Sequence, residues 1–285
     1  MYRTQLPILI VMAIGLVPGE PARATNIPAE LAKAGELKVG IRCEAPPSGF
    51  LDEHGRPAGI DVDFARHIAE LTFGSPDKAV FTCVTAASRV QMLLSKKVDL
   101  LIATLGVTDE RKRAVDFATS MDWGSSGVLV RDKEDHYANL DAFKGKTLLT
   151  DKGSWQSAYL QAKYPDIHLV KYDSINDAIE ALRQGRGDGL TQDLPTLVTA
   201  ADKDPRLKVT NIVFQAGWSA PAVRRGDNDL RLYINTMVTR AKTDGTFVSS
   251  INKYTSGHSR ELAIRAYTTM APDGSTDQNA PLPPR

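Results

Sequence analysis

The stretch Val98-Asp99-Leu100-Leu101-Ile102-Ala103-Thr104-Leu105-Gly106-Val107-Thr108-Asp109-Glu110-Arg111 decides the fold of this chain. Its first five residues are typical of a buried strand, and small and hydroxyl residues follow where that strand would end. Ligands of open α/β sheets bind outside the carboxyl ends of the strands. Arg111 comes next, beside free backbone N–H groups, and a guanidinium can hold a carboxylate through two hydrogen bonds. The stretch therefore predicts a site for a small anion.

Upstream of this stretch, strand and helix patterns alternate. Residues 37–42 and 79–84 read as strands, and 98–103 as a third. Apolar residues recur at helical spacing in 59–72, and 88–97 reads as a second helix. The order β-α-β-α-β predicts a parallel sheet flanked by helices.

Downstream, the same pattern starts again. It predicts strands at 147–150, 168–171 and 188–191, a strand-like return at 209–224, and helices at 154–164, 175–182, from about 195, 230–243 and 247–254. Two such units, joined through 124–131, predict a two-lobe α/β fold with a hinged cleft that closes on its ligand. We assign residues 25–122 and 220–257 to lobe 1 and 123–219 to lobe 2. Residues 258–285 show little apolar periodicity and form a C-terminal extension, disordered from about Ala271.

Residues 1–24 have the features of a secretory signal peptide, with an apolar middle and an A-x-A cleavage site at Ala22-Arg23-Ala24. The apolar part, Leu6 to Val17, is too short to span a bilayer. We therefore expect an exported, periplasmic mature chain from about Thr25. Loss of Arg3, Arg23 and Glu20 with the leader leaves 33 basic and 33 acidic residues, a balance that argues against nucleic acid as a partner.

The cysteines and histidines argue against a metal or other cofactor. The five histidines show no metal-ligand spacing, and the lysine-rich turn at 143–147 lacks the earlier glycine of a phosphate loop. Cys43 and Cys83 both fall near the carboxyl ends of neighbouring predicted strands. In an oxidising compartment they form a disulfide, or else they are two small buried hydrophobic residues.

Several of these motifs together resemble a known family. The chain is similar, over residues 37–255, to the periplasmic solute-binding proteins of polar amino-acid ABC transporters, extracellular solute-binding family 3. The motifs that carry the resemblance are Leu37-Lys38-Val39-Gly40-Ile41-Arg42, Pro46-Pro47-Ser48-Gly49-Phe50, Gly59-Ile60-Asp61-Val62-Asp63-Phe64, Ala103 to Arg111, Asp188 to Asp193 and Asp244-Gly245-Thr246.

The resemblance implies roles for particular residues. Arg111 would bind the α-carboxylate of an amino acid, and Asp193 its α-amino group. Thr104 would offer its backbone carbonyl to the amino group and Gly106 its N–H to the carboxylate. The start of the helix at Ser154 and Trp155 would add N–H donors, as helix N-termini do for anions.

Several candidate site residues also have a purely structural explanation. Arg111 and Arg89 can be solvated surface residues, and Asp193 can simply cap the helix near Pro195. In acidic-amino-acid binders of the family an arginine at the position of Arg89 meets the side-chain carboxylate. Trp155 can wall the cleft or pack on its own helix.

Two further features concern the walls of the cleft. Gly106 lacks the hydroxyl that is usual in the family, and Ala86 stands near the missing aromatic wall of the second-strand loop. Phe50 is a weaker candidate for that wall.

We therefore expect a monomeric binding protein, without cofactor, that captures a polar amino acid, an acidic one among the options. It would deliver that amino acid to a membrane permease of an ABC transporter. One alternative is a periplasmic dehydratase of prephenate or arogenate type on the same fold, with Glu44 as its acid. Another is a ligand sensor that partners a membrane receptor.

Overall fold

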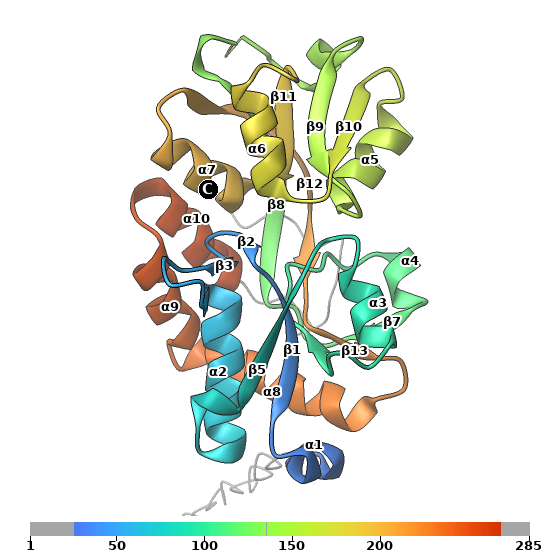
Figure 1. Ribbon diagram of the computed structural model, residues 1–285, viewed down its shortest axis with the longest axis vertical. Helices are drawn as coiled ribbons and strands as arrows, with labels where there is room; N and C mark the ends of the chain where they lie inside the picture. Colours follow the sequence, from blue (N-terminus) through green and yellow to red (C-terminus); the bar gives the residue numbers. More distant parts are fainter. Residues whose placement is uncertain (1–25, 135, 269–285) are drawn as a thin grey trace, which may run out of the picture.

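The computed structural model describes residues 26–134 and 136–268 and shows two lobes stacked along the long axis of the molecule (Figure 1). The lobe at the bottom of the figure, lobe 1, is built on a sheet with the order β5 (Ala79–Val84), β1 (Leu37–Arg42), β6 (Leu100–Leu101), β13 (Ala222–Arg224), β7 (Val115–Phe117). Lobe 2 is built on a sheet with the order β10 (His168–Tyr172), β9 (Thr147–Asp151), β11 (Gly189–Asp193), β8 (Asp122–Arg131), β12 (Leu207–Ser219). This confirms the predicted two-lobe α/β fold.

Both sheets are mixed. In lobe 1, β5, β1 and β6 are parallel, whereas β13 runs antiparallel to β6 and β7. In lobe 2, β10, β9 and β11 are parallel and β8 and β12 antiparallel. The third predicted strand is shorter than expected, since only Leu100–Leu101 pairs within a named strand.

The two lobes are connected by the long antiparallel strands β8 and β12, which run between them in Figure 1. Their register pairs Trp123 with Trp218, and the two indole rings meet edge to face at 4.7 Å between centroids. Both rings are buried, so this aromatic pair forms a small core at the crossing between the lobes.

Helices flank both sheets. Those of lobe 1 are α1 (Ala29–Ala34), α2 (Ile60–Phe73), α3 (Arg89–Leu94), α4 (Asp109–Lys112), α8 (Asn228–Thr243) and α9 (Thr246–Tyr254), and those of lobe 2 are α5 (Trp155–Lys163), α6 (Ile175–Arg183) and α7 (Leu194–Lys203). The predicted amphipathic helix α2 buries Ile60, Phe64 and Ile68 against the first sheet. It ends at Gly74, whose left-handed φ of 73° lets its N–H close the last turn on Glu70.

A small three-stranded sheet is an element that the sequence patterns did not predict. It consists of β2 (Glu44–Ala45), β3 (Gly49–Leu51) and β4 (Pro57–Ala58), beside the amino end of α2. Phe50 lies in this sheet, and its ring packs edge-on against Tyr254 of α9 at 5.5 Å between centroids.

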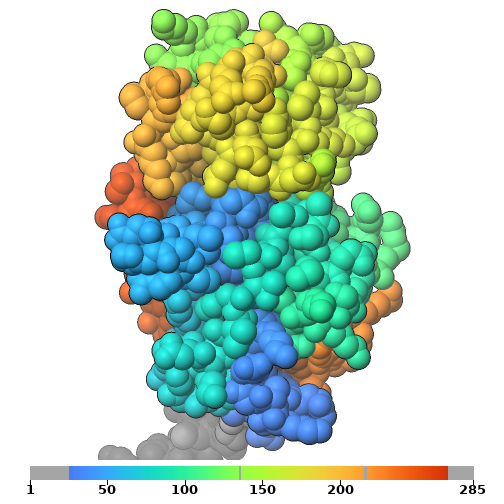
Figure 2. All heavy atoms as spheres, viewed as in Figure 1, coloured from blue at the N-terminus to red at the C-terminus, as the bar shows by residue number. Residues whose placement is uncertain are grey.

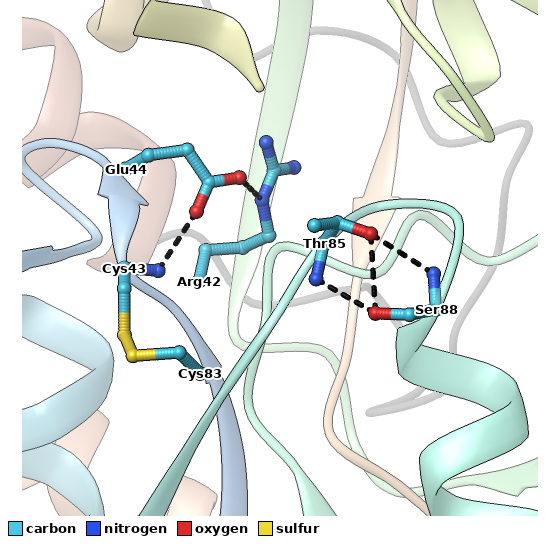
Figure 3. Close-up of a disulfide and its surroundings, with 6 residues drawn as sticks. All are labelled: Arg42, Cys43, Glu44, Cys83, Thr85 and Ser88. Carbon is cyan, nitrogen blue, oxygen red and sulfur yellow. Dashed lines mark hydrogen bonds and ion pairs between the residues drawn. A yellow bond between two sulfur atoms is a disulfide. The ribbon is translucent and has the colours of Figure 1, made fainter. Parts of the chain in front are cut away.

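The disulfide between Cys43 and Cys83 settles the alternative that the sequence left open. It joins neighbouring strands whose register pairs Ile41 with Cys83, with 5.4 Å between the two Cα atoms (Figure 3). Beside it, Thr85 and Ser88 exchange backbone-to-hydroxyl hydrogen bonds and fix the turn that leads into α3.

The C-terminal region begins with an element that the sequence patterns did not assign. A further helix, α10 (Gly257–Thr268), follows α9 and buries Ser259, Ala263, Ala266 and Tyr267. These residues are mostly small, which is why the region lacks an obvious apolar stripe. The predicted leader at 1–24 and the residues from Ala271 onward lie outside the described residues. In the part of the chain that is described, the helices are too short or too polar to cross a membrane.

Candidate functional site

The cleft lies where the carboxyl ends of β1, β5 and β6 in lobe 1 face those of β9 and β11 in lobe 2. The lobes are in contact across it, and in Figure 2 the atoms of lobe 2 rest directly on those of lobe 1. A pocket remains between them, lined by Thr104 and Gly106 of lobe 1, by Trp155 and Asp193 of lobe 2, by Asp122 of β8, and by residues of α10.

Arg111 is placed at the cleft by the short helix α4. Thr108 caps this helix by accepting a hydrogen bond from the backbone N–H of Arg111 at 3.2 Å. The Arg111 guanidinium donates to the carbonyl of Gly106 at 2.7 Å and, across the cleft, to that of Gly153 at 2.9 Å. Burial lowers the pKa of Arg111, and the carboxylates of Glu110 and Asp193 oppose this. Arg111 therefore bridges the two lobes beside the pocket, although it is not among the residues that line it.

Asp193 ends β11 at the first position before α7, but its side chain does not cap that helix. Its Oδ1 instead accepts hydrogen bonds from Trp155 Nε1 at 3.2 Å and Gln156 Nε2 at 2.7 Å. Burial raises the pKa of Asp193, and the nearby charge of Asp151 raises it further. The carboxylate is held by two neutral donors and forms no ion pair with a described residue.

Trp155 explains two unusual residues of the cleft. A Cβ atom at Gly106 would lie 3.3 Å from its indole, and one at Gly217 would lie 2.5 Å from it. The ring therefore rests on the bare backbone of both glycines and reaches Asp193 through its N–H. The missing hydroxyl at Gly106 and the large residue at 155 are one feature, since the first makes room for the second. Of the two alternatives for Trp155, the structure has the one in which its ring forms part of the cleft wall.

Arg89 is fully enclosed rather than solvated, with 2% of its surface exposed. Its Nη1 donates to the carbonyls of Ala103, at 2.5 Å, and Thr104, at 3.1 Å. Thr104 has a φ of 47°, a strained conformation for a β-branched residue, and Arg89 holds the backbone there. Burial lowers the pKa of Arg89 well below its usual range, and the charges of Arg111 and Arg42 add to that effect.

Arg42 and Asp151 form a charged pair between the lobes that the sequence reasoning missed. Both are buried, and Arg42 Nη2 donates to Asp151 Oδ2 at 3.1 Å. Glu44 accepts from Arg42 Nε at 2.8 Å and from the backbone of Cys43 (Figure 3), while Gln192 donates to the other oxygen of Asp151 at 2.8 Å. The partners are 109 positions apart, so nothing local in the sequence signals the pair.

The two remaining predicted site residues lie as follows. Ser154 caps α5: its hydroxyl accepts the N–H of Ser157 at 3.1 Å and donates to the carbonyl of Asp151 at 2.9 Å. Phe50 is not among the residues that line the pocket, because the small sheet turns its ring toward α9. Nor does a group of three His, Cys, Asp or Glu residues suited to a metal ion occur within 26–134 and 136–268.

The chain is similar to known proteins. The family described as bacterial extracellular solute-binding proteins, family 3, matches residues 37–257. A glutamine-binding protein of Geobacillus stearothermophilus is 31% identical over 196 residues, which are 68% of this chain and 75% of the relative. The L-cystine-binding protein of Escherichia coli strain K12 is 27% identical over 249 residues, 86% of this chain and 92% of the relative.

A solved structure is also similar. The solute receptor for L-cysteine of Neisseria gonorrhoeae superposes with a TM-score of 0.76 at 32% identity, covering 79% of this chain and 92% of that chain.

Proposed function

Because the chain belongs to the bacterial extracellular solute-binding proteins, family 3, we propose that its cleft binds one free amino acid as a zwitterion, with Arg111 on the carboxylate and Asp193 on the ammonium group. The chain is the amino-acid-binding component of an ABC transporter. Such proteins work outside the cytoplasmic membrane and present their ligand to a membrane permease. We further propose that this one does so as a monomer.

The observation that carries the proposal is the position of Arg111 and Asp193 on opposite lobes. Arg111 already reaches the backbone of Gly153 in lobe 2, and the Asp193 carboxylate lies in the pocket wall with only neutral donors bonded to it. Burying either end of a zwitterion unpaired would cost several kcal/mol. A ligand that pairs both ends therefore links the lobes, and its binding is coupled to closure.

Arg89 is proposed to assist at the carboxylate. It lies beside Arg111, and its buried Nε has no hydrogen-bond partner among the described residues. The acidic-ligand hypothesis instead assigns Arg89 to a side-chain carboxylate. Binding of a panel of amino acids separates the two, because the second hypothesis requires aspartate or glutamate to bind best.

The binding role also fits the relatives better than catalysis does, since they are named as binding proteins of transporters rather than as enzymes. Glu44, the acid of the dehydratase alternative, is bonded to Arg42 and to the backbone of Cys43.

The proposal is tested by calorimetric titration of the mature chain from Thr25 with the twenty amino acids. We expect at least one to bind with micromolar affinity, about −8 kcal/mol. The variant Arg111→Ala should bind it on the order of 100-fold more weakly, because a charge-assisted pair is lost. Arg113→Ala is the matched control: it removes the same charge two residues away, from an exposed position. Equal affinities of the two variants, or no binding by the wild type, would refute the proposal.

A further inference from the structure

Apart from its first residue, the helix α10 lies outside the part of the chain that the family model matches, yet its residues line the pocket. The family match ends at residue 257, where α10 begins. The helix contacts α8 and α9 of lobe 1, and also α7 of lobe 2 and the connecting strand β8. In Figure 1 it lies beside α7 at the level where the lobes meet.

The helix is held firmly to lobe 1. Lys242 of α8 donates to the carbonyl of Tyr267 at 2.9 Å, a cation at the end of the helix where its dipole is negative. The ring of Tyr267 packs on Phe247 of α9 at 5.2 Å between centroids, and Arg260 donates to the carbonyl of Thr255 at 2.8 Å. The helix is thus a fixed wall on the lobe 1 side.

The face of α10 toward the cleft carries two small side chains. Ala263 and Ala266 are three residues apart, so they lie on one side of the helix, and both line the pocket together with Tyr267. Across the pocket stand Pro195 and Thr196 of α7, beside the proposed ammonium-binding residue Asp193. The space next to the backbone of a bound amino acid is therefore bounded by α10, where its side chain would enter.

The charged side chains that line this space are carboxylates. Asp122 and Asp193 line it, and no lysine or arginine is among its described lining residues. Asp122 Oδ2 accepts a hydrogen bond from the Ser219 hydroxyl, whereas Oδ1 receives none from the described residues. Behind it, the Oδ2 atom of the buried Asp61 also lacks a donor. One ammonium group satisfies one carboxylate, so the second remains for another donor.

We propose that α10 and Asp122 form the side-chain subsite of the cleft, and that it selects amino acids whose side chain ends in a hydrogen-bond donor. This inference rests on the proposed amino-acid binding. The donor is an amide, ammonium or guanidinium group, and it bonds to Asp122 Oδ1. The small residues at 263 and 266 set the room for the methylene groups that precede it.

The experiment compares ligand pairs on the full mature protein by calorimetry: glutamine with glutamate, and lysine with norleucine. The donor-bearing member of at least one pair should bind tenfold or more tightly than its partner. Asp122→Asn should reduce that preference to less than threefold, because one of its two acceptor atoms becomes an amino group. Tighter binding of glutamate than glutamine, together with no preference for lysine over norleucine, would overturn the inference.

A pair of variants tests the wall formed by α10 independently of Asp122. Ala266→Leu should weaken the best ligand at least tenfold, whereas Glu261→Leu places the same leucine on the exposed side of the same helix and should leave affinity within twofold. Thermal unfolding of both variants verifies that they fold. Equal affinities would overturn the inference while leaving the proposed function intact. Loss of all amino-acid binding in the wild type would instead refute the proposed function.

Discussion

Arg42 and Arg89 lie at the same edge of the lobe 1 sheet and are equally buried, with 3% and 2% of their surface exposed, yet their surroundings are opposite. Arg42 is bonded to the carboxylates of Glu44 and Asp151. Burial alone lowers its pKa, but the two carboxylates outweigh burial and the pKa lies above its usual value. Arg89 donates only to backbone carbonyls, and the net effect on its pKa is a decrease.

The difference shows that a buried charge can have two purposes in one cleft. Arg42 meets its partners within the chain, and because Asp151 belongs to the other lobe, the pair stabilises the closed arrangement. Arg89, with Arg111 beside it, keeps positive charge in the cleft that no carboxylate of the described residues neutralises through an ion pair. In the proposed function, the carboxylate of the ligand would neutralise this charge, so the two arginines would favour closure with ligand over closure without it.

Removal of the Asp151 carboxylate should leave Arg42, like Arg89, without an ion pair to the other lobe. For Asp151→Asn we expect closure to lose about 3 kcal/mol, the lower end for breaking a buried ion pair, so amino-acid affinity falls on the order of 100-fold. Calorimetry measures the affinity and small-angle scattering the degree of closure.

The control for this variant is Asp173→Asn, which removes the exposed pair with Lys152. That pair should be worth less than about 1 kcal/mol. Indistinguishable affinities for the two variants would mean that Arg42 and Asp151 do not hold the lobes together.

A pH titration should reveal a partly buried acidic group without an ion-pair partner among the described residues, the carboxyl group of Asp122. Burial raises the pKa of Asp122 to about 7 from 3.8, although the Ser219 bond opposes this. Between about pH 4 and 7 the folded chain therefore holds a proton that the unfolded chain has released, and stability falls as the pH rises. The full change corresponds to about 4 kcal/mol, and partial contact with solvent reduces our expectation to roughly 2 kcal/mol.

Denaturant unfolding between pH 4 and 8 measures this slope, and Asp122→Asn should flatten it. Asp109→Asn, at an exposed position in α4, should leave the slope unchanged. A slope that is the same in both variants would show that Asp122 titrates as an ordinary surface carboxylate.

The smallest expected effect comes from the variant of Arg89, which is compared directly with the same variant of Arg42. Arg89→Met should weaken amino-acid binding about tenfold while stability changes by less than about 1 kcal/mol, because a desolvated cation is removed along with its backbone bonds. Arg42→Met leaves two carboxylates without their cation and should destabilise the fold more. The midpoints of thermal unfolding compare the two variants, and equal losses of stability would contradict the distinction drawn between them.

The sequence predicts the fold well, because the signals for the fold are local. The order of strands and helices follows from periodicity. Asp193 ends the strand β11 and Arg111 lies in the short helix α4, each within a recognisable motif. The sequence also predicts that the cysteines lie near the carboxyl ends of neighbouring strands, and only their pairing depends on the distance between β1 and β5.

What escaped prediction depends on distance in the chain or on small residues. The Arg42–Asp151 pair joins residues 109 positions apart in different lobes, and the fit of Trp155 on Gly106 and Gly217 joins three separate segments. The helix α10 buries alanines and a tyrosine rather than leucines, so its pattern is weak although its position is fixed by tertiary contacts.

The hydrogen bond from Trp155 to Asp193 has an optical consequence. The chain has three tryptophans, of which Trp123 and Trp218 are buried against each other at the crossing of the lobes. The indole of Trp155 instead donates a hydrogen bond to the Asp193 carboxylate, which in the proposed function also binds the ammonium group of the ligand. Its fluorescence will change when that group arrives, so the protein carries its own reporter, and the kinetics of ligand capture can be followed in a stopped-flow instrument without any added label.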